Sequence, residues 1–412
     1  MKHKTSIYIL ILILTTFVGF WGIPKLVKTA TYSPDRYPFV YYSSLLKELC
    51  LIDFKNDEFP MRDVSGNVYN QHQFDSLLPL FNFRQLASEG KLPKEVDGHE
   101  INMPLLNSKS IVYRYEPNKF FTPDPGLYIM SEALPKRVKK TTPEDVFRLT
   151  DRIEFINTAS NSINVEKSDR FRKELLAEGY SFPAQWVSGD MNPMKPYEEG
   201  FFSLDADGKF YQIKMVNSRP FVRNTHVGDS IDIAYFSMME MGDKRFYGFL
   251  YDKSGNIYII EEGGGKYTPI KLEIAPIDIN TDKVLIMGNL LYWTVTTTKP
   301  DKQVAYGLKT ESLERVAEYT IERETNKWDI VSKWLFPAYL TFEQKYVSGF
   351  IYPVFNFTGF YVFIVNFILA VGVFFLNTQT TKKRIFNSIY ILITGIVGLI
   401  ALLILPEFRK RI

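Results

Sequence analysis

The stretch that decides the fold lies near the end of the chain. Residues 346–381 read YVSGFIYPVFNFTGFYVFIVNFILAVGVFFLNTQTT, and residues 385–405 read IFNSIYILITGIVGLIALLIL; neither contains a charged side chain. Between them stand Lys382, Lys383 and Arg384. A helix needs about 20 apolar residues to cross about 30 Å of hydrocarbon. Both stretches reach that length, so the sequence predicts two transmembrane helices joined by a basic turn.

A third apolar stretch, Ile7 to Val27, lies at the other end of the chain, after a basic start. This pattern is typical of a signal peptide or a signal anchor. Bulky or charged residues stand where a cleavage site needs small ones, which favours an uncleaved anchor. We therefore expect four parts: an N-terminal membrane anchor (1–28), a mixed α/β part (29–199), a β-rich repeat part (200–345) and a C-terminal two-helix membrane hairpin (346–412).

Basic residues beside the apolar stretches predict the orientation of the chain. Positive charge favours the cytoplasmic side, so Lys2 and Lys4 place the N-terminus in the cytoplasm, and 382–384 fall there too. A third full crossing would leave Arg409–Arg411 outside, against this rule. Either the last stretch does not cross completely, or the earlier charges dominate. We expect a multi-pass protein of the bacterial inner membrane with a periplasmic ectodomain.

Composition excludes some classes of partner and site. Residues 29–345 hold 39 Lys and Arg and 45 Asp and Glu, a net charge of −6. Nucleic-acid-binding domains favour a basic face, so nucleic acid is not an expected partner. The single cysteine, Cys50, allows neither an intrachain disulfide nor a CxxC motif.

Residues 200–322 show short strand patterns separated by turns. The hairpin turns Asp205–Gly208 and Asp252–Gly255 place their glycines 47 residues apart, and Lys299–Lys302 follows at a similar interval. Upstream, Asp63–Tyr69 nearly repeats the residues that begin at Asp252. A period in the forties with several strands is typical of propeller blades. The expected fold is an α+β membrane protein with an incomplete or divergent propeller-like ectodomain; a β-sandwich is the alternative.

The first part of the ectodomain mixes helix and strand patterns. Phe83–Glu89, which Gly90 would end, is predicted to be a helix. Thr142 is followed by Pro, Glu and Asp, which predicts a second helix start. Ile111–Tyr115 and Ile153–Ile156 are predicted strands.

Two methionine clusters with a histidine between them are the candidates for a metal site. Thioether sulfur is a soft ligand that suits Cu(I), but methionine also fills hydrophobic cores. A periplasmic sensor or copper-binding protein is therefore an alternative function. The candidate ligands are Met191, Met194, Met238, Met239, Met241 and His226.

No catalytic pattern stands out, since GxSxG and SxxK are absent from the sequence. Asp205-x-Asp207-Gly208 resembles the start of a calcium loop but lacks its distal Glu. Glu198–Glu199 and Glu261–Glu262 are adjacent pairs, which on a strand point to opposite faces; we expect solvated turn charges. We expect no enzyme activity and no cofactor. An enzyme whose site is assembled across blades is the second alternative.

Asn366 is a polar residue in the middle of an apolar stretch. Buried amides in membrane helices often hydrogen-bond to another helix; a tolerated lone amide is the alternative. Together with the basic turn it gives the candidates for contact with a partner protein, which are Asn366, Lys382, Lys383 and Arg384.

Several motifs resemble a family of membrane-anchored bacterial proteins that carry a domain of unknown function. The similar motifs are Phe147–Phe155, Lys195–Phe202, Asp205–Gly208, Lys214–Val216 and Pro220–Phe221. The resemblance implies a gene neighbourhood with ABC transporter components and thus an accessory role in export or envelope metal handling. It supplies no site residues. We expect a non-enzymatic accessory or scaffold subunit with the lipid bilayer and other membrane proteins, such as ABC transporter subunits, as partners.

Overall fold

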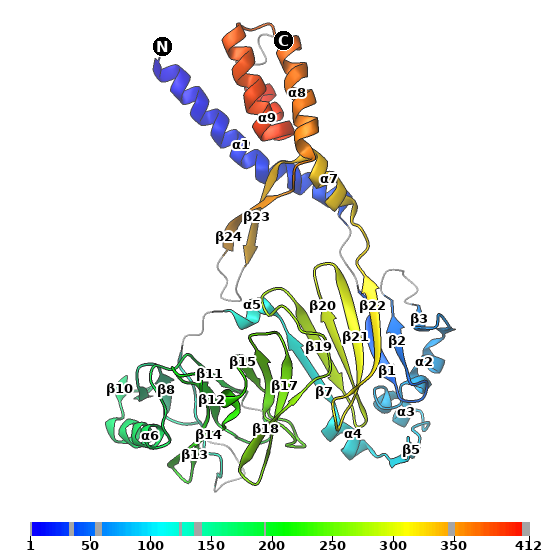
Figure 1. The fold of residues 1–412 in the computed structure, drawn as a ribbon, viewed down its shortest axis with the longest axis vertical. Helices are drawn as coiled ribbons and strands as arrows, with labels where there is room; N and C mark the ends of the chain where they lie inside the picture. Colours follow the sequence, from blue (N-terminus) through cyan, green and yellow to red (C-terminus); the bar gives the residue numbers. More distant parts are fainter. Residues whose placement is uncertain are drawn as a thin grey trace. The chain divides into compact units, whose positions relative to one another are not determined.

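The computed structural model describes residues 2–32, 37–53, 60–122, 126–135, 142–192, 195–344 and 351–405. The chain forms two compact units (Figure 1). The terminal unit contains Met1–Arg36 and Arg323–Ile412, and the central unit contains Tyr37–Glu322. The two apolar ends of the chain therefore fold into one unit.

Three antiparallel meanders follow one another in the second half of the central unit. In each, the second and third strands are joined at one of the predicted turns, which explains the regular spacing of the turns in the sequence. The strands are β11 (Trp186–Gly189), β12 (Phe201–Leu204), β13 (Phe210–Val216) and β14 (Arg219–Asn224); β15 (Ile233–Met238), β16 (Gly248–Asp252), β17 (Ile257–Gly263) and β18 (Lys266–Lys271); and β19 (Lys283–Gly288), β20 (Tyr292–Thr298), β21 (Lys302–Lys309) and β22 (Arg315–Glu322).

Strands from the first half of the unit complete and extend these sheets. Strand β7 (Ile111–Tyr115) pairs with β19 and makes the third meander five-stranded. One further sheet contains β1 (Phe39–Ser43), β2 (Glu48–Ile52), β3 (Met61–Asp63) and β4 (Val68–Tyr69). Others contain β8 (Asp145–Leu149), β9 (Ile153–Asn157) and β10 (Ser162–Ile163), and the pair β5 (Glu95–Val96) and β6 (His99–Glu100). The blade-like meanders exist, but the described strands form neither a closed barrel nor a closed propeller.

Short helices connect the strands of the central unit. The predicted helix at Phe83 and the strands at Ile111 and Ile153 are confirmed, but the segment after Thr142 forms strand β8 instead of a helix. In β8, Phe147 and Leu149 are buried while Arg148 is exposed, so a period of two outweighs the helix-start signal. The helices are α2 (Gln71–Leu77), α3 (Phe83–Ser88), α4 (Met103–Lys109), α5 (Pro117–Phe120), α6 (Val165–Ala177) and the 3₁₀ turn η1 (Val227–Asp229).

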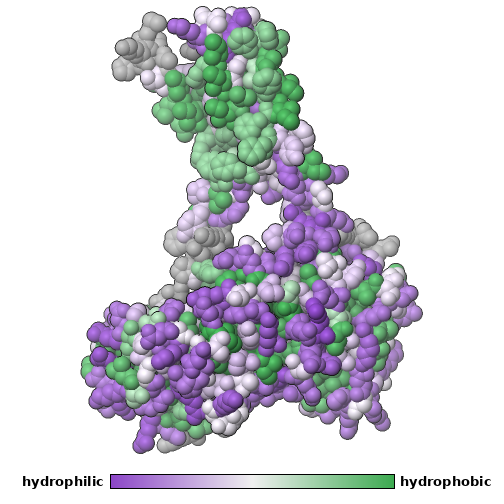
Figure 2. Space-filling model, in the orientation of Figure 1, coloured by the Kyte–Doolittle hydropathy of each residue, from purple (hydrophilic) through white to green (hydrophobic). Residues whose placement is uncertain are grey.

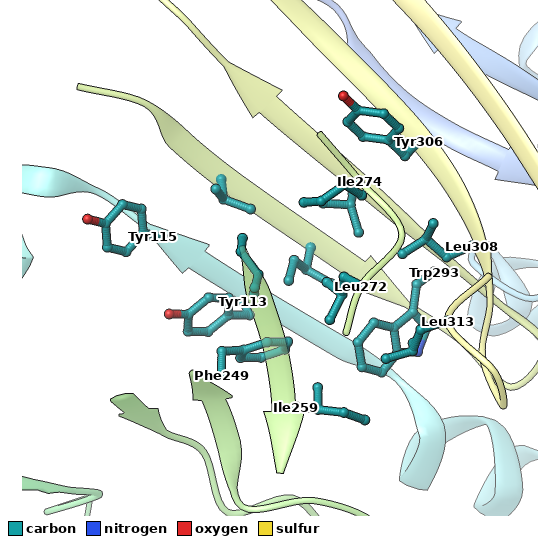
Figure 3. Packing of buried hydrophobic residues seen from close by; sticks show 14 of the residues in the cluster. Tyr113, Tyr115, Phe249, Ile259, Leu272, Ile274, Trp293, Tyr306, Leu308 and Leu313 are labelled. Carbon is teal, nitrogen blue, oxygen red and sulfur yellow. The ribbon is translucent and has the colours of Figure 1, made fainter. Parts of the chain in front are cut away.

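The largest hydrophobic cluster joins the second and third meanders. Figure 3 shows Trp293, Tyr306 and Leu308 of the third meander on one side and Phe249 and Ile259 of the second on the other. The buried Tyr251 hydroxyl donates a hydrogen bond to the Tyr113 hydroxyl at 3.0 Å, so it is not left unsatisfied in the core. Aromatic side chains thus make up much of this core.

The repeated turn motif has the same hydrogen bonds in two sheets. The Asp63 carboxylate accepts from the Asn67 amide N–H at 2.9 Å and from the Tyr69 hydroxyl at 2.7 Å. Asp252 accepts from the amide N–H of Asn256 at 2.8 Å and from the Tyr258 hydroxyl at 3.0 Å. The sequence repeat therefore encodes a side chain that closes a tight hairpin turn.

The terminal unit differs from the expected three membrane helices. It contains α1 (Lys2–Thr31), α7 (Lys327–Leu335), β23 (Ala338–Gln344), β24 (Ile351–Phe357), α8 (Val362–Leu376) and α9 (Thr381–Ile404). The stretch 346–381 is not one helix. Its first part contains strand β24, and α8 has 15 residues, which is about 22 Å. Ile351–Phe357 is rich in aromatic and β-branched residues, which favour a strand.

Two helices, α1 and α9, are long and apolar enough to cross a membrane. Helix α9, however, is interrupted at Gly395, whose φ of 63° and ψ of −145° are not helical. A Cβ on Gly398 would lie 3.0 Å from the Tyr390 ring. Eight residues of straight helix rise about 12 Å, which is more than a tyrosine side chain spans, so the chain bends sharply at Gly395. The predicted span 385–405 is therefore two short helical segments.

Candidate functional site

Asn366 lies at the break in α9. Its side-chain amide nitrogen donates to the Leu392 carbonyl oxygen at 3.0 Å, and its side chain is fully buried. That carbonyl needs a partner, because at a break the backbone loses its i+4 hydrogen bonds. Gly395 is required beside it, since a Cβ there would stand 2.5 Å from Asn366 Oδ1. The lone amide that the sequence shows is thus used within the chain, between α8 and α9.

Helix α1 packs against both segments of α9. Thr16 and Tyr390 share a hydrogen bond between their hydroxyls, and Val397 sits directly against Gly19. The last described residue, Leu405, belongs to a hydrophobic cluster that includes Leu12 and Tyr8. The α1 residues of that cluster precede Gly19, the neighbour of Val397, in the sequence. The second segment therefore runs back toward the N-terminal end of α1.

The basic turn lies at the start of α9, which Figure 1 shows at the same end of the terminal unit as the start of α1. Lys382 and Lys383 are exposed, and Arg384 donates through Nε to the Gln379 carbonyl oxygen at 2.9 Å. Cations in the first turn oppose the helix dipole, so the helix does not explain their position. Anionic lipid headgroups do attract such side chains.

A buried ion cluster lies in the central unit, where the sequence suggested solvated turn charges. Lys195 Nζ is 2.7 Å from Glu198 Oε1 and 2.7 Å from Glu240 Oε2. The three side chains are 7%, 3% and 1% exposed. Glu199 points elsewhere, to Lys214 Nζ at 2.6 Å. The expectation for Glu198 was wrong, because its neighbour Lys195 and the distant Glu240 enclose it.

Backbone amides complete this cluster. The Gly200 N–H donates to Glu198 Oε1 at 2.9 Å, and the Glu199 N–H donates to the Glu240 carboxylate. The residues lie where the chain enters β12 and leaves β15, so the cluster ties the first two meanders together. Burial raises the pKa of Glu240 to about 7, against the opposing effect of Lys195. The cluster can therefore bind or release a proton near neutral pH.

The described candidate copper ligands pack in different places. Met238 lies in the hydrophobic cluster between the first two meanders, whereas Met239 and Met241 pack in the one that contains Trp293. Met191 is exposed, and the exposed His226 places Nδ1 3.0 Å from Asp229. The remaining candidate, Met194, lies outside the described residues.

Acidic and histidine side chains do not gather either. Across the described parts of the chain, no group of three or more His, Cys, Asp or Glu could hold a metal ion. Asp205, at the start of the calcium-like motif, is buried and accepts the Lys209 amide N–H at 2.8 Å. Sequence reasoning missed the Lys195–Glu240 pair, because 45 residues separate the two. The spacing of Lys195 and Glu198 was the visible signal.

A family model described as "Domain of unknown function (DUF4857)" matches residues 39–308. No curated protein matches the chain. Among solved structures, the chain is similar to PorZ, a bacterial surface component of the type-IX secretion system of Porphyromonas gingivalis, with 10% identity and a TM-score of 0.22. That match covers 71% of this chain and 33% of PorZ, so the chain spans about a third of the length of that structure.

Proposed function

This chain belongs to the DUF4857 family, and we propose that it is a membrane-anchored accessory subunit without enzymatic activity. Its partner is another integral membrane protein, and the partner that we propose is an ABC transporter permease. The central unit is held outside the cytoplasm and serves as a scaffold. The observation that carries the proposal is the outward face of α8.

This face is apolar and uncovered by the described chain. Phe375 is 75% exposed, and the space-filling view shows a hydrophobic surface over the helices of the terminal unit (Figure 2). Soluble proteins rarely expose such patches unless they meet lipid or a partner. The other exposed apolar residues of α8 are Phe363, Ile364, Phe367, Ile368, Val371 and Leu376.

The hydrogen bonds between the helices of the terminal unit support a role beyond anchoring. One apolar helix is enough to hold a domain at a membrane. Here α8 and α9 are added, with the buried Asn366 contact and the Thr16–Tyr390 hydrogen bond between helices. Broken helices with satisfied backbone groups are typical of membrane proteins that work inside the bilayer.

The turn at Gly395 also supports one orientation of the chain. If Lys2 and Lys4 lie in the cytoplasm, so does the basic turn at 382–384, and α9 ends at Leu405 facing that same side. Arg409–Arg411 then obey the positive-inside rule. The accessory subunit thus has both termini in the cytoplasm.

The test is a crosslinked purification of the full chain from native membranes, with co-purified proteins identified by mass spectrometry. We expect an ABC permease and its ATPase to be enriched. A purification under the same conditions without crosslinker controls for contaminants. Recovery of the chain alone would contradict the accessory function.

A further inference from the structure

The hairpin of β23 and β24 has an apolar face and an opposite, more polar face. Residues paired across an antiparallel ladder project to the same side. Leu340 pairs with Phe355, and Ala338 pairs with Phe357, so apolar side chains share one face. The other face carries the polar side chains of Glu343, Thr341 and Asn356 together with their cross-strand partners Tyr352, Val354 and Tyr339. On it, Asn356 Nδ2 donates to Thr341 Oγ1 at 2.8 Å, and that hydroxyl donates to Glu343 Oε1 at 2.8 Å.

The apolar face is only partly covered by α1. Phe17 packs edge-on against Phe355, and Trp21 against Phe342, each with ring centroids 6.0 Å apart. Phe357 nevertheless remains 85% exposed, and Phe355 47%. The hairpin therefore adds exposed aromatic side chains to the apolar surface that α1 forms around Phe17 and Trp21.

Two physical constraints fix the environment of this hairpin. Large exposed aromatic side chains are unfavourable in bulk water. The two-stranded sheet also has two open edges, and unpaired backbone groups do not occur in lipid-exposed hydrocarbon. The headgroup layer of a bilayer satisfies both constraints. The adjacent acyl chains can cover the aromatic side chains, and water can hydrogen-bond to the open strand edges. Aromatic side chains are enriched there.

The helix lengths agree with this position. Helix α8 is about 22 Å long, and the α9 segment before Gly395 is 14 residues, about 21 Å. Both fall short of the hydrocarbon thickness of about 30 Å. The aromatic side chains of the hairpin lie directly before α8 in the chain and extend the apolar layer.

We propose that the β23–β24 hairpin lies in the headgroup layer of the membrane, with its apolar face toward the acyl chains and its polar face toward water. The inference rests on the membrane location given under Proposed function. The ligand of this surface is the lipid interface of the leaflet opposite the basic turn. Phe357 lies deepest, because it is nearest α8, and Ile351 lies at the shallow end.

The single native cysteine makes a spin-label experiment possible in the full chain. Cys50 is fully buried, and burial, together with the charges of Asp63 and Glu48, raises the pKa of its thiol to about 12, so it resists labelling. Nitroxide would be attached to F357C, F355C, I351C and E343C, one at a time. The unsubstituted chain gives the blank. Two reference positions are I368C, a 64% exposed position in the middle of α8, and V68C, a 69% exposed position in the central unit.

The measurement is power-saturation electron paramagnetic resonance in vesicles of 3:1 phosphatidylcholine and phosphatidylglycerol. The ratio of accessibility to oxygen over a water-soluble nickel chelate rises with depth. We expect a severalfold higher ratio at 357 than at 68, values falling from 357 through 355 to 351, and a ratio at 343 close to that at 68. Every hairpin position would still fall below 368, in the middle of α8.

Two outcomes separate this inference from the function on which it rests. If 368 is deep while 357 and 355 match 68, the hairpin is in water and the inference is overturned, although the membrane location stands. If 368 also matches 68, the membrane location itself is wrong, and both the inference and the proposed function are overturned. If 343 is as deep as 357, the hairpin is inserted without an orientation and the proposed interface is overturned.

Discussion

Asn366 donates its side-chain amide to the Leu392 carbonyl oxygen, at 3.0 Å, from a fully buried position between α8 and α9. The contact stands three residues before Gly395, where the helical backbone is interrupted. An amide therefore replaces a backbone partner at a break in an apolar environment. This relationship gives the first two predictions.

Gly395→Ala is expected to destabilise the protein by about 1–3 kcal/mol, because a non-glycine residue is strained at this φ and ψ. The new Cβ would also press on Asn366 Oδ1. Thermal unfolding of the purified full chain in detergent measures the effect. Gly372→Ala is the matched control, since it lies within α8 with nothing near its Cβ position and should be neutral or slightly stabilising. Equal behaviour of the two variants would contradict the described break.

Asn366→Leu is expected to lower stability by about 1–2 kcal/mol, because it leaves the Leu392 carbonyl without its donor. Phe367→Leu, at the exposed neighbouring position, is the control and should be nearly silent. Co-purification from native membranes provides a second readout. Loss of partner proteins with unchanged thermal stability would show that the amide serves a partner helix instead.

The C-terminus is expected on the cytoplasmic side, because α9 turns back at Gly395. An epitope tag placed after Ile412 should be digested by protease in inverted membrane vesicles and protected in spheroplasts. A tag before Met1 is the control for the same side. Digestion of the C-terminal tag in spheroplasts would mean that α9 crosses completely.

The buried cluster predicts a pH dependence of stability. Burial raises the pKa of Glu240 to about 7, whereas an unfolded Glu titrates near 4.3. Between these values the folded chain holds more protons than the unfolded chain, so this group lowers stability as pH rises from about 4.5 to about 7, with no further change above. Glu240→Gln should remove that slope from melting temperatures measured across pH. The exposed Glu100→Gln should keep it. An unchanged slope in the Glu240 variant would refute the buried titration.

Asp252→Ala is expected to destabilise the central unit by about 1–3 kcal/mol, because it leaves the donors of Asn256 and Tyr258 unsatisfied. Asp63→Ala should act in the same direction through Asn67 and Tyr69. The control is Asp301→Ala, in the exposed turn between β20 and β21. Denaturant unfolding of the full chain compares them. A similar loss in all three variants would show that turn propensity, not the hydrogen bonds, is responsible.

The sequence predicted the apolar character of the terminal segments better than their secondary structure. A lack of charge constrains the environment of a segment, whereas the period of its side chains constrains its conformation. The uncharged stretch 346–381 was therefore recognised as apolar, but it does not form the single helix that we expected. Ile351–Phe357 forms a strand, and α8 is short. The break at Gly395 was not visible, since glycine is common in membrane helices.

In the central unit, local signals succeeded and long-range ones failed. The turns at Asp205 and Asp252 were found because their chemistry is contained in a few residues. The ion cluster was missed because Glu240 reaches Lys195 through the packing of two sheets. Asn366 was found because one amide in an apolar run is conspicuous, although its partner, a backbone carbonyl, has no sequence signal.

The most direct test of the accessory-subunit function is photocrosslinking from the outward face of α8 in native membranes. A photoreactive amino acid would replace Phe375, which is exposed, or Ala370, which is buried against α9 and serves as the control. We predict a crosslink from position 375 to an integral membrane protein, an ABC permease in the first instance, and none from position 370. Crosslinks from 375 to lipid alone would contradict the account.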